Sequence, residues 1–203
     1  MIRLIVAAST NGVIGRSGKL PWQLIPEDRK WLLEQIKEGV VILGRNSFEE
    51  TAGPLPGVHA TVVVTSRKEI GSTTTNQGGS GVVTTRSSLR LAVSEATRLA
   101  TFSESGANDD EENKCRPIWI CGGERIYREA LLLREAHLLY LTRVHHWIDG
   151  DTRFPSSYRS FFPEELWRHE SADKNYNYTF SVHGKQGSPK INPSPGSWEY
   201  ALR

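Results

Sequence analysis

The sequence predicts a single-domain α/β fold with a mostly parallel central sheet, flanking helices and an antiparallel hairpin at its C-terminal edge. Short runs rich in β-branched residues alternate with segments of helical periodicity up to residue 144, as in a parallel sheet that helices cover on both faces. Beyond that residue the pattern becomes strand-like, which favours antiparallel strands at one edge. The length of 203 residues fits one domain with a sizeable core.

Apolar and β-branched runs of strand length predict the strands. They cover residues 2–8, 40–43, 60–65, 81–84, 117–121, 137–144, 167–170, 176–182 and 198–202. Helical spacing of apolar residues predicts the helices, over residues 26–38, 46–51, 87–102 and 124–133. Pro26 suits the first turn of the first helix and Gly39 follows its end. Either Ser87 or Ser88 is expected to be the N-cap of the third helix.

Three segments fall outside this alternation. Residues 71–80 are rich in Gly, Ser and Thr, and residues 103–114 are acidic, so both are expected to be solvated loop insertions. Residues 184–196 hold three prolines and three glycines, which predicts a long excursion between two edge strands.

The composition excludes several classes of protein. A net charge of +2 is too small to favour a nucleic acid or an anionic membrane as partner. Cys115 and Cys121 are too few for a disulfide framework and lack the spacing of a zinc site. The N-terminal apolar run suits a buried strand better than a signal peptide, and no segment is long enough to span a bilayer. We therefore expect a cytoplasmic monomer with no metal, nucleic-acid or membrane partner.

One face of the first helix combines a carboxylate with apolar residues. Asp28, Trp31, Leu32, Gln35 and Ile36 share this face at helical spacing. Asp28 has two interpretations. It could stabilise the helix N-terminus, which position alone favours, or it could be held in a pocket to bind a cationic or amidine-like ligand.

Five loops follow predicted strands and could bind a ligand, although each alone could be an ordinary surface turn. Residues 12–22 form a glycine-containing loop that lacks the G-x-G-x-x-G spacing of a Rossmann fingerprint. Residues 44–47 and 65–67 each place an arginine beside polar groups after a buried strand, which favours a ligand with several phosphates. The glycine pair within 120–124 allows a ligand to approach the backbone closely. Residues 150–155 have the composition of a turn.

Taken together, these segments resemble the dihydrofolate reductase family over about three quarters of the chain. The motifs occur in the family's order: IVAAS at 5–9, GVIG at 12–15, LPW at 20–22, LGRNSFE at 43–49, PLPG at 54–57, VVVTSR at 62–67, ICGGERIY at 120–127, LYLTRV at 139–144 and GDTRFP at 150–155. A carboxylate, Asp28, stands six residues after the tryptophan of LPW.

The resemblance implies the substrate site. Asp28 would bind the pterin N3 and 2-amino group, with Thr142 holding that carboxylate, Trp22 binding a nearby water, and Leu20 lying on a mobile loop over the nicotinamide. The substrate pocket would also include Ile5, Val6, Arg29, Leu32, Thr51, Leu55 and Cys121. Dihydrofolate is the implied substrate, and antifolate inhibitors are the other implied ligands.

The implied cofactor is NADPH, which would give a hydride from nicotinamide C4 to pterin C6 while water delivers a proton to N5. An arginine near the adenosine ribose favours NADPH over NADH. The reason is that a phosphate group forms stronger, charge-assisted bidentate hydrogen bonds with arginine than a hydroxyl group does. The implied cofactor-binding residues are Ala7, Ile14, Gly15, Gly44, Arg45, Asn46, Ser47, Thr65, Ser66, Arg67, Gly122, Gly123, Glu124, Arg125, Ile126 and Tyr127.

One position departs from the family. Val58 stands where members usually place an arginine that binds the folate α-carboxylate. Arg29 and Lys30 could compensate, but we expect weaker binding of the glutamyl tail. Two alternatives stay open: a related reductase whose substrate lacks that tail, a pterin or a pyrimidine of riboflavin synthesis, and a catalytically silent NADPH-binding regulatory protein.

Overall fold

Eight strands form one large sheet, and two short strands pair separately. The large sheet contains β1 (Ile2–Ser9), β3 (Val40–Gly44), β4 (Ala60–Val64), β5 (Val82–Arg86), β6 (Ile118–Ile120), β7 (Ala136–Val144), β9 (Glu164–Ala172) and β10 (Asn177–Gly184). The small sheet pairs β2 (Val13–Gly15) with β8 (Thr152–Arg153). The helices are α1 (Pro26–Ile36), α2 (Arg45–Glu50), α3 (Leu89–Ala100), α4 (Glu124–Ala130) and α5 (Tyr158–Phe161). The computed structural model describes residues 1–67, 81–101 and 115–188.

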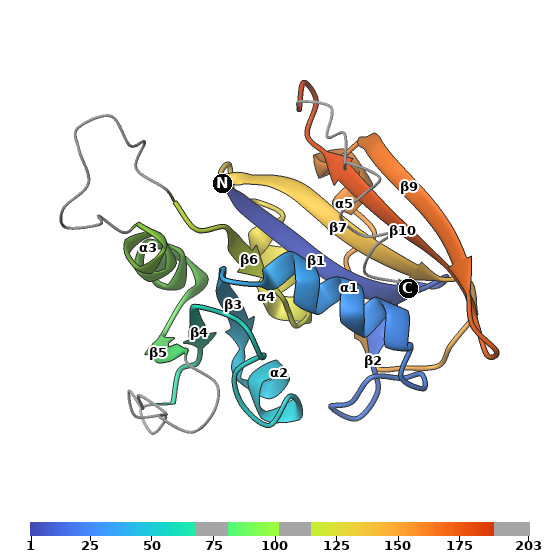
Figure 1. Ribbon diagram of the computed structural model, residues 1–203, viewed down its shortest axis with the longest axis horizontal. Coiled ribbons are helices and arrows are strands. Elements are labelled where there is room, and N and C mark those ends of the chain that lie inside the picture. Colours follow the sequence, from blue (N-terminus) through green and yellow to red (C-terminus); the bar gives the residue numbers. More distant parts are fainter. Residues whose placement is uncertain (68–80, 102–114, 189–203) are drawn as a thin grey trace.

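The strand order of the large sheet is β5-β4-β3-β6-β1-β7-β10-β9 (Figure 1). All pairs from β5 to β7 are parallel, whereas β10 runs antiparallel to both β7 and β9. The predicted α/β fold, with a mostly parallel sheet and an antiparallel edge hairpin, is confirmed.

The sheet separates two hydrophobic cores, because successive side chains of a strand point to opposite faces. Leu4 and Val6 of β1 belong to the core under α3, α4 and α5, whereas Ile5 belongs to the core under α1. Figure 1 shows α1 crossing in front of the sheet. Its Trp31 and Ile36 are buried against the sheet, so the first turn of α1 is held near the carboxyl end of β1.

The predicted elements differ from the observed ones mainly at their ends. Helix α1 ends at Ile36, two residues before the predicted end, and Glu38 takes a positive φ of 58°. Gly39 has another role: a Cβ there would lie 2.9 Å from both the Pro117 carbonyl oxygen and the Trp119 ring. Of the two predicted N-caps, Ser88 is the observed one, and its Oγ accepts a hydrogen bond from the Leu91 amide.

Some elements were not predicted, and some predictions cannot be compared with the structure. The short elements β2, β8 and α5 fall in segments that the sequence assigned to loops or left unassigned. The predicted insertions at 71–80 and 103–114, the strand at 198–202 and most of the excursion at 184–196 lie outside the described residues.

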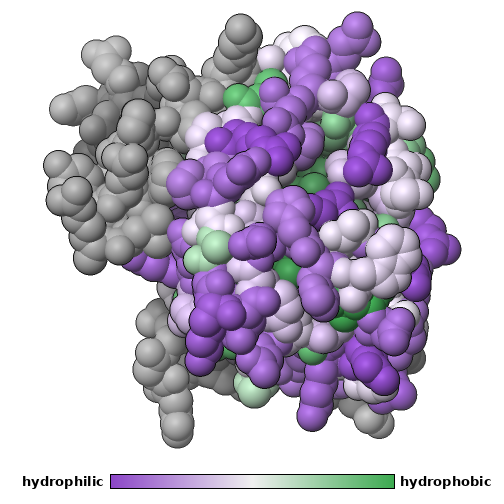
Figure 2. Space-filling view, turned by 90° about the vertical axis from the view of Figure 1, so that its right-hand side faces the viewer, coloured by the Kyte–Doolittle hydropathy of each residue, from purple (hydrophilic) through white to green (hydrophobic). Residues whose placement is uncertain are grey.

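The edge strand β9 is protected by charge. Along β9, half-buried residues alternate with exposed ones, and Arg168 forms ion pairs with Glu165 and Glu170. The face of the molecule that carries this edge is mostly hydrophilic (Figure 2). Charged side chains on an edge strand disfavour pairing with another chain. No helix among the described residues is long and apolar enough to cross a membrane.

Candidate active site

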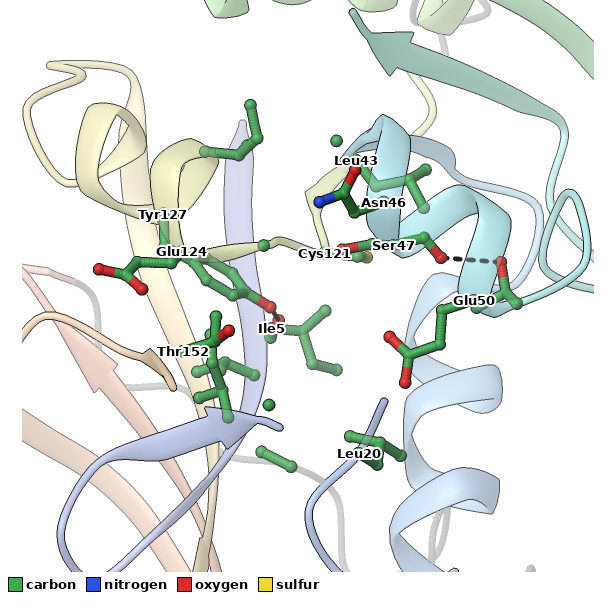
Figure 3. Close-up of a pocket in the computed structure, with 18 of the residues that line it drawn as sticks. Ile5, Leu20, Leu43, Asn46, Ser47, Glu50, Cys121, Glu124, Tyr127 and Thr152 are labelled. Atoms are coloured by element: carbon green, nitrogen blue, oxygen red, sulfur yellow. Dashed lines mark hydrogen bonds between the residues drawn. The ribbon is translucent and has the colours of Figure 1, made fainter. Parts of the chain in front are cut away.

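A cavity of about 1010 Å³ opens beside the carboxyl ends of the parallel strands, between α1, α2, α4 and the loop after β2. The described residues place 24 of the predicted site residues on its wall; Trp22, Gly122 and Arg67 are the exceptions. Figure 3 shows Glu124 and Tyr127 of α4 on one side and Asn46, Ser47 and Glu50 of α2 on the other. Ile5 and Cys121 lie between these sides, and Leu20 lies at the rim.

The carboxyl group of Asp28 occupies one end of the cavity, in the first turn of α1. The pKa of Asp28 is raised to about 6: burial is the largest cause, a hydrogen bond from Thr142 opposes it, and the negative charge of Glu27 adds to the increase. The group is therefore mostly ionised at neutral pH and becomes half protonated near pH 6. A ligand that presents two N–H donors side by side would favour the carboxylate.

The walls around Asp28 are apolar. Ile5, Leu32 and Leu55 supply aliphatic surface, and Trp31 lies beside them. Burial raises the pKa of the Cys121 thiol to about 12, so this thiol stays protonated and is a poor nucleophile. The shape and chemistry of this end suit a flat heterocycle with one polar edge.

Trp22 lies behind the cavity wall. Its side chain is 8% exposed and belongs to the same core as Ile25 and Trp31. It therefore fixes the end of the loop that carries Leu20, which is 48% exposed.

The other end of the cavity is polar and partly cationic. Gly44 ends β3 at the start of α2, and Arg45, Asn46 and Ser47 follow it on the cavity wall. Arg45 pairs with Glu49 at 2.7 Å in this structure. Because an exposed pair of this kind contributes only about 0.3–0.5 kcal/mol, the guanidinium can exchange it for a phosphate.

Further polar groups extend this region along the sheet edge. Thr65 and Ser66, which follow β4, and Arg125 of α4 also line the cavity. Arg67 is exposed next to Ser66, and its amide donates to Thr65 Oγ1 at 3.1 Å. These groups suit a ligand with several phosphates.

The glycine pair brings backbone close to the cavity. Gly122 has a φ of 107°, its peptide bond to Gly123 is cis, and its carbonyl oxygen accepts a hydrogen bond from the Gly44 amide at 2.7 Å. A Cβ on Gly122 would lie 3.0 Å from the Tyr127 ring, and one on Gly123 would lie 3.3 Å from Ser47 Oγ. A side chain at Gly122 would therefore press on Tyr127, and one at Gly123, which lines the cavity, would crowd Ser47.

Tyr127 connects α4 to the central strand. Its hydroxyl donates to the Ile5 carbonyl oxygen at 2.6 Å. Burial raises the pKa of Tyr127 well above its usual value, so the hydroxyl remains a donor. This bond joins α4 to β1 across the inner wall of the cavity.

Several cavity residues were missed by the sequence reasoning. Asp151 and Thr152 line the cavity, and Asp151 Oδ2 accepts a hydrogen bond from the Ser17 amide at 2.8 Å, which ties two loops together. The turn composition of 150–155 gave no sign of this contact. Glu50 also lines the cavity, and burial raises its pKa while the Leu20 amide donates to it. Its position four residues after Asn46 on α2 could have indicated it.

Comparison with known proteins agrees with this geometry. A family model described as dihydrofolate reductase matches residues 1–185. The chain belongs to the dihydrofolate reductase family. It is 32% identical to dihydrofolate reductase type 3 of Salmonella typhimurium, covering 86% of this chain and 91% of that protein. It is 28% identical to dihydrofolate reductase of Buchnera aphidicola subsp. Baizongia pistaciae, covering 89% and 96% respectively.

A solved structure of the same family has a similar fold. Dihydrofolate reductase from Enterococcus faecalis, complexed with NADP(H) and RAB-propyl, superposes with a TM-score of 0.68 at 27% identity. The match covers 91% of this chain and 96% of that one. The family membership expected from the ordered motifs is therefore confirmed.

Proposed function

We propose that the protein reduces 7,8-dihydrofolate to 5,6,7,8-tetrahydrofolate with NADPH. One observation carries the proposal: Asp28, hydrogen-bonded by Thr142, lies in an apolar slot of the same cavity whose other end is lined by polar and cationic groups. Binding of two ring systems in one cavity would hold them at contact distance, and orientation of this kind supplies much of the rate of a bimolecular step.

The residues of this chain fit NADPH, which when bound supplies the hydride. Arg45, Asn46 and Ser47 at the start of α2, with the backbone around Gly123, would hold the phosphates. Thr65, Ser66 and Arg67 would hold the adenosine ribose and its 2′-phosphate. The absence of a side chain at Gly123 leaves its backbone accessible on the cavity wall beside Ser47.

On the substrate side, Asp28 would accept hydrogen bonds from N3 and the 2-amino group of the pterin. Thr142 would orient that carboxylate, and Ile5, Leu32 and Leu55 would pack against the rings. Water would deliver the proton to N5 while the loop at Leu20 opens, since Leu20 is partly exposed at the cavity rim. We further propose that antifolate inhibitors bind the same slot, and that the protein is a cytoplasmic monomer.

Substitution of Asp28 tests this proposal. Oxidation of NADPH, followed by absorbance with dihydrofolate and without substrate, should fall about a hundredfold or more in Asp28→Asn, because the amide cannot bind the pterin as the carboxylate does. Binding of NADPH should change little. Glu34→Gln, which removes an exposed carboxylate from the same helix, is the matched control and should keep wild-type turnover. An Asp28→Asn enzyme as active as the wild type would overturn the role given to Asp28.

A related substrate without a glutamyl tail is the second candidate. Val58 is 4% exposed and packs in the core under α1, so position 58 supplies no positive charge to the cavity. Arg29, which directly follows Asp28 in the sequence, lines the cavity and could supply a positive charge for the tail. A third arm of the same assay, with dihydrobiopterin, compares the two substrates. If the tail contributes little, the two values of kcat/KM should agree within about tenfold, whereas a strong preference for dihydrofolate would favour a tail-binding role for Arg29.

A further inference from the structure

The carboxylate of Glu27 precedes Asp28 on α1 but faces the edge hairpin instead of the cavity. Its Oε2 accepts one hydrogen bond from the Tyr178 hydroxyl at 2.5 Å and another from Ser171 Oγ at 2.6 Å. Tyr178 and Ser171 are direct partners across the antiparallel β10–β9 ladder. A single oxygen of Glu27 therefore joins the first turn of α1 to both strands of the hairpin.

A second contact holds the loop before α1 on the same hairpin. Asn175 Nδ2 donates to Gln23 Oε1 at 3.1 Å. The β9–β10 turn that carries Asn175 is itself fixed, because Asp173 Oδ1 accepts the amides of Asn175 and Tyr176 at 2.7 and 2.8 Å. The hairpin thus contacts the chain on both sides of the start of α1.

Apolar packing continues the contact one turn further along the helix. The rings of Trp31 and Phe180 have centroids 4.8 Å apart, and those of Phe180 and Tyr178 are 5.4 Å apart. The start of α1 needs such support, because its N-cap Ile25 provides no side-chain hydrogen bond. Glu27 supplies a polar contact with the hairpin where side-chain capping is missing.

Glu27 also acts on its neighbour through charge. Its two hydrogen-bond donors are neutral hydroxyl groups, so its negative charge is not cancelled by an ion pair with them. The charged and titratable groups around this contact are Asp28 on the same helix, Tyr178 on β10 and Asp173 in the β9–β10 turn. The charge of Glu27 is one cause of the raised pKa of Asp28, and burial is the larger one.

We propose that Glu27 is a positioning residue for the reaction, which fixes the first turn of α1 on the β9–β10 hairpin and acts on Asp28 through its charge. The proposal rests on the substrate-binding role proposed for Asp28. It assigns to the edge hairpin, which does not line the cavity, a function in placing the pterin-binding carboxylate.

Two substitutions separate the charge of Glu27 from its hydrogen bonds. Glu27→Gln keeps an oxygen acceptor and removes the charge. Tyr178→Phe removes one donor and keeps the ring that packs on Phe180. Glu34→Gln on the same helix is the control for loss of an exposed carboxylate. Thermal unfolding of each variant shows whether the fold is retained.

The first measurement is the pKa of Asp28 in the NADPH complex, by NMR of protein labelled with 13C at the aspartate carboxyl groups. The signal is assigned by its absence in Asp28→Asn. Removing a neighbouring negative charge should lower this pKa by about half a unit in Glu27→Gln, as expected for charges separated by a few ångströms in a partly solvated site. Glu34→Gln should leave the pKa unchanged. Equal midpoints in Glu27→Gln and the wild type would overturn the charge effect.

The second measurement is the steady-state kinetics with dihydrofolate. Loss of one hydrogen bond in Tyr178→Phe should raise KM about fivefold with kcat changed less than about twofold, because the carboxylate is then less well placed in the ground state. An unchanged KM would overturn the positioning effect. If instead Asp28→Asn proves fully active, the role proposed for Asp28 fails, whereas the titration of Glu27→Gln still decides whether Glu27 acts on it.

Discussion

At the scale of single residues, Asp28 shows how a binding group can lower the stability of the protein that contains it. The unfolded chain ionises this carboxyl group at its ordinary pKa of 3.8, whereas burial raises the folded pKa to about 6. The folded state therefore binds more protons than the unfolded state between these values, and stability falls as pH rises through this window. Below pH 3.8 both states are protonated and the penalty disappears.

This residue gives a prediction about stability that is independent of activity. In the ligand-free protein at pH 8, Asp28→Asn should raise the free energy of unfolding by about 1–2 kcal/mol, less than the full shift implies because the cavity is open to water. The gain should shrink as pH falls toward 4. Urea unfolding at several pH values measures both. A variant that is less stable than the wild type at pH 8 would contradict the assigned desolvation of Asp28.

At the scale of elements, the end of α1 shows two neighbouring residues with opposite requirements. Glu38 adopts a left-handed conformation with a φ of 58°, which a glycine would adopt without steric cost. Gly39 instead has no room for a side chain, because a Cβ would lie 2.9 Å from Pro117 O and 3.0 Å from Ile36 O. Both contacts are with backbone atoms, so little relaxation is available.

Substitutions at these two positions should therefore change stability in opposite directions. Gly39→Ala should lower the free energy of unfolding by about 1–3 kcal/mol through overpacking. Glu38→Gly should raise it by about 0.5 kcal/mol, since relief of the left-handed strain exceeds the added entropy of the unfolded chain. Thermal or urea unfolding measures both effects. If both variants were destabilised equally, any change at the end of α1 would lower the stability. The close approach of backbone atoms at Gly39 would then not be the cause.

The same scale explains what the sequence could and could not reveal. Hydrophobic periodicity is a local signal, so it located β1, β3, β4 and the long helices to within a few residues. Elements of two to four residues, such as β8 and α5, are too short to show a hydrophobic period, so this signal cannot predict them. Contacts between distant residues are equally hidden: Glu27 and Tyr178 lie 151 residues apart along the chain. The candidate site was predictable through ordered motifs, whereas the roles of Glu50 and Asp151 depend on which loops the fold brings together.

At the scale of the whole molecule, the sheet holds the cavity between parts that are far apart in the sequence. The Ser17 amide reaches Asp151 Oδ2 at 2.8 Å, and β2 pairs with β8, so the N-terminal loop is fixed by the segment after β7. The described ends of one predicted insertion also meet: Thr101 and Cys115 form an antiparallel bridge, and the Arg116 amide donates to Ala100 O at 2.9 Å.

Because these ends are already paired, the segment between them should be dispensable. Replacing residues 103–113 by a short Gly-Ser turn should leave kcat/KM for dihydrofolate within about twofold and should raise the free energy of unfolding by about 1 kcal/mol, since a shorter loop costs less closure entropy. A variant with the same residues in reversed order separates length from sequence and should match the wild type. A loss of activity in both variants would mean that this acidic segment has a specific role in activity, and the cavity alone would then not account for function. Retained activity in both would place the catalytic unit within the sheet, its helices and the loops that line the cavity.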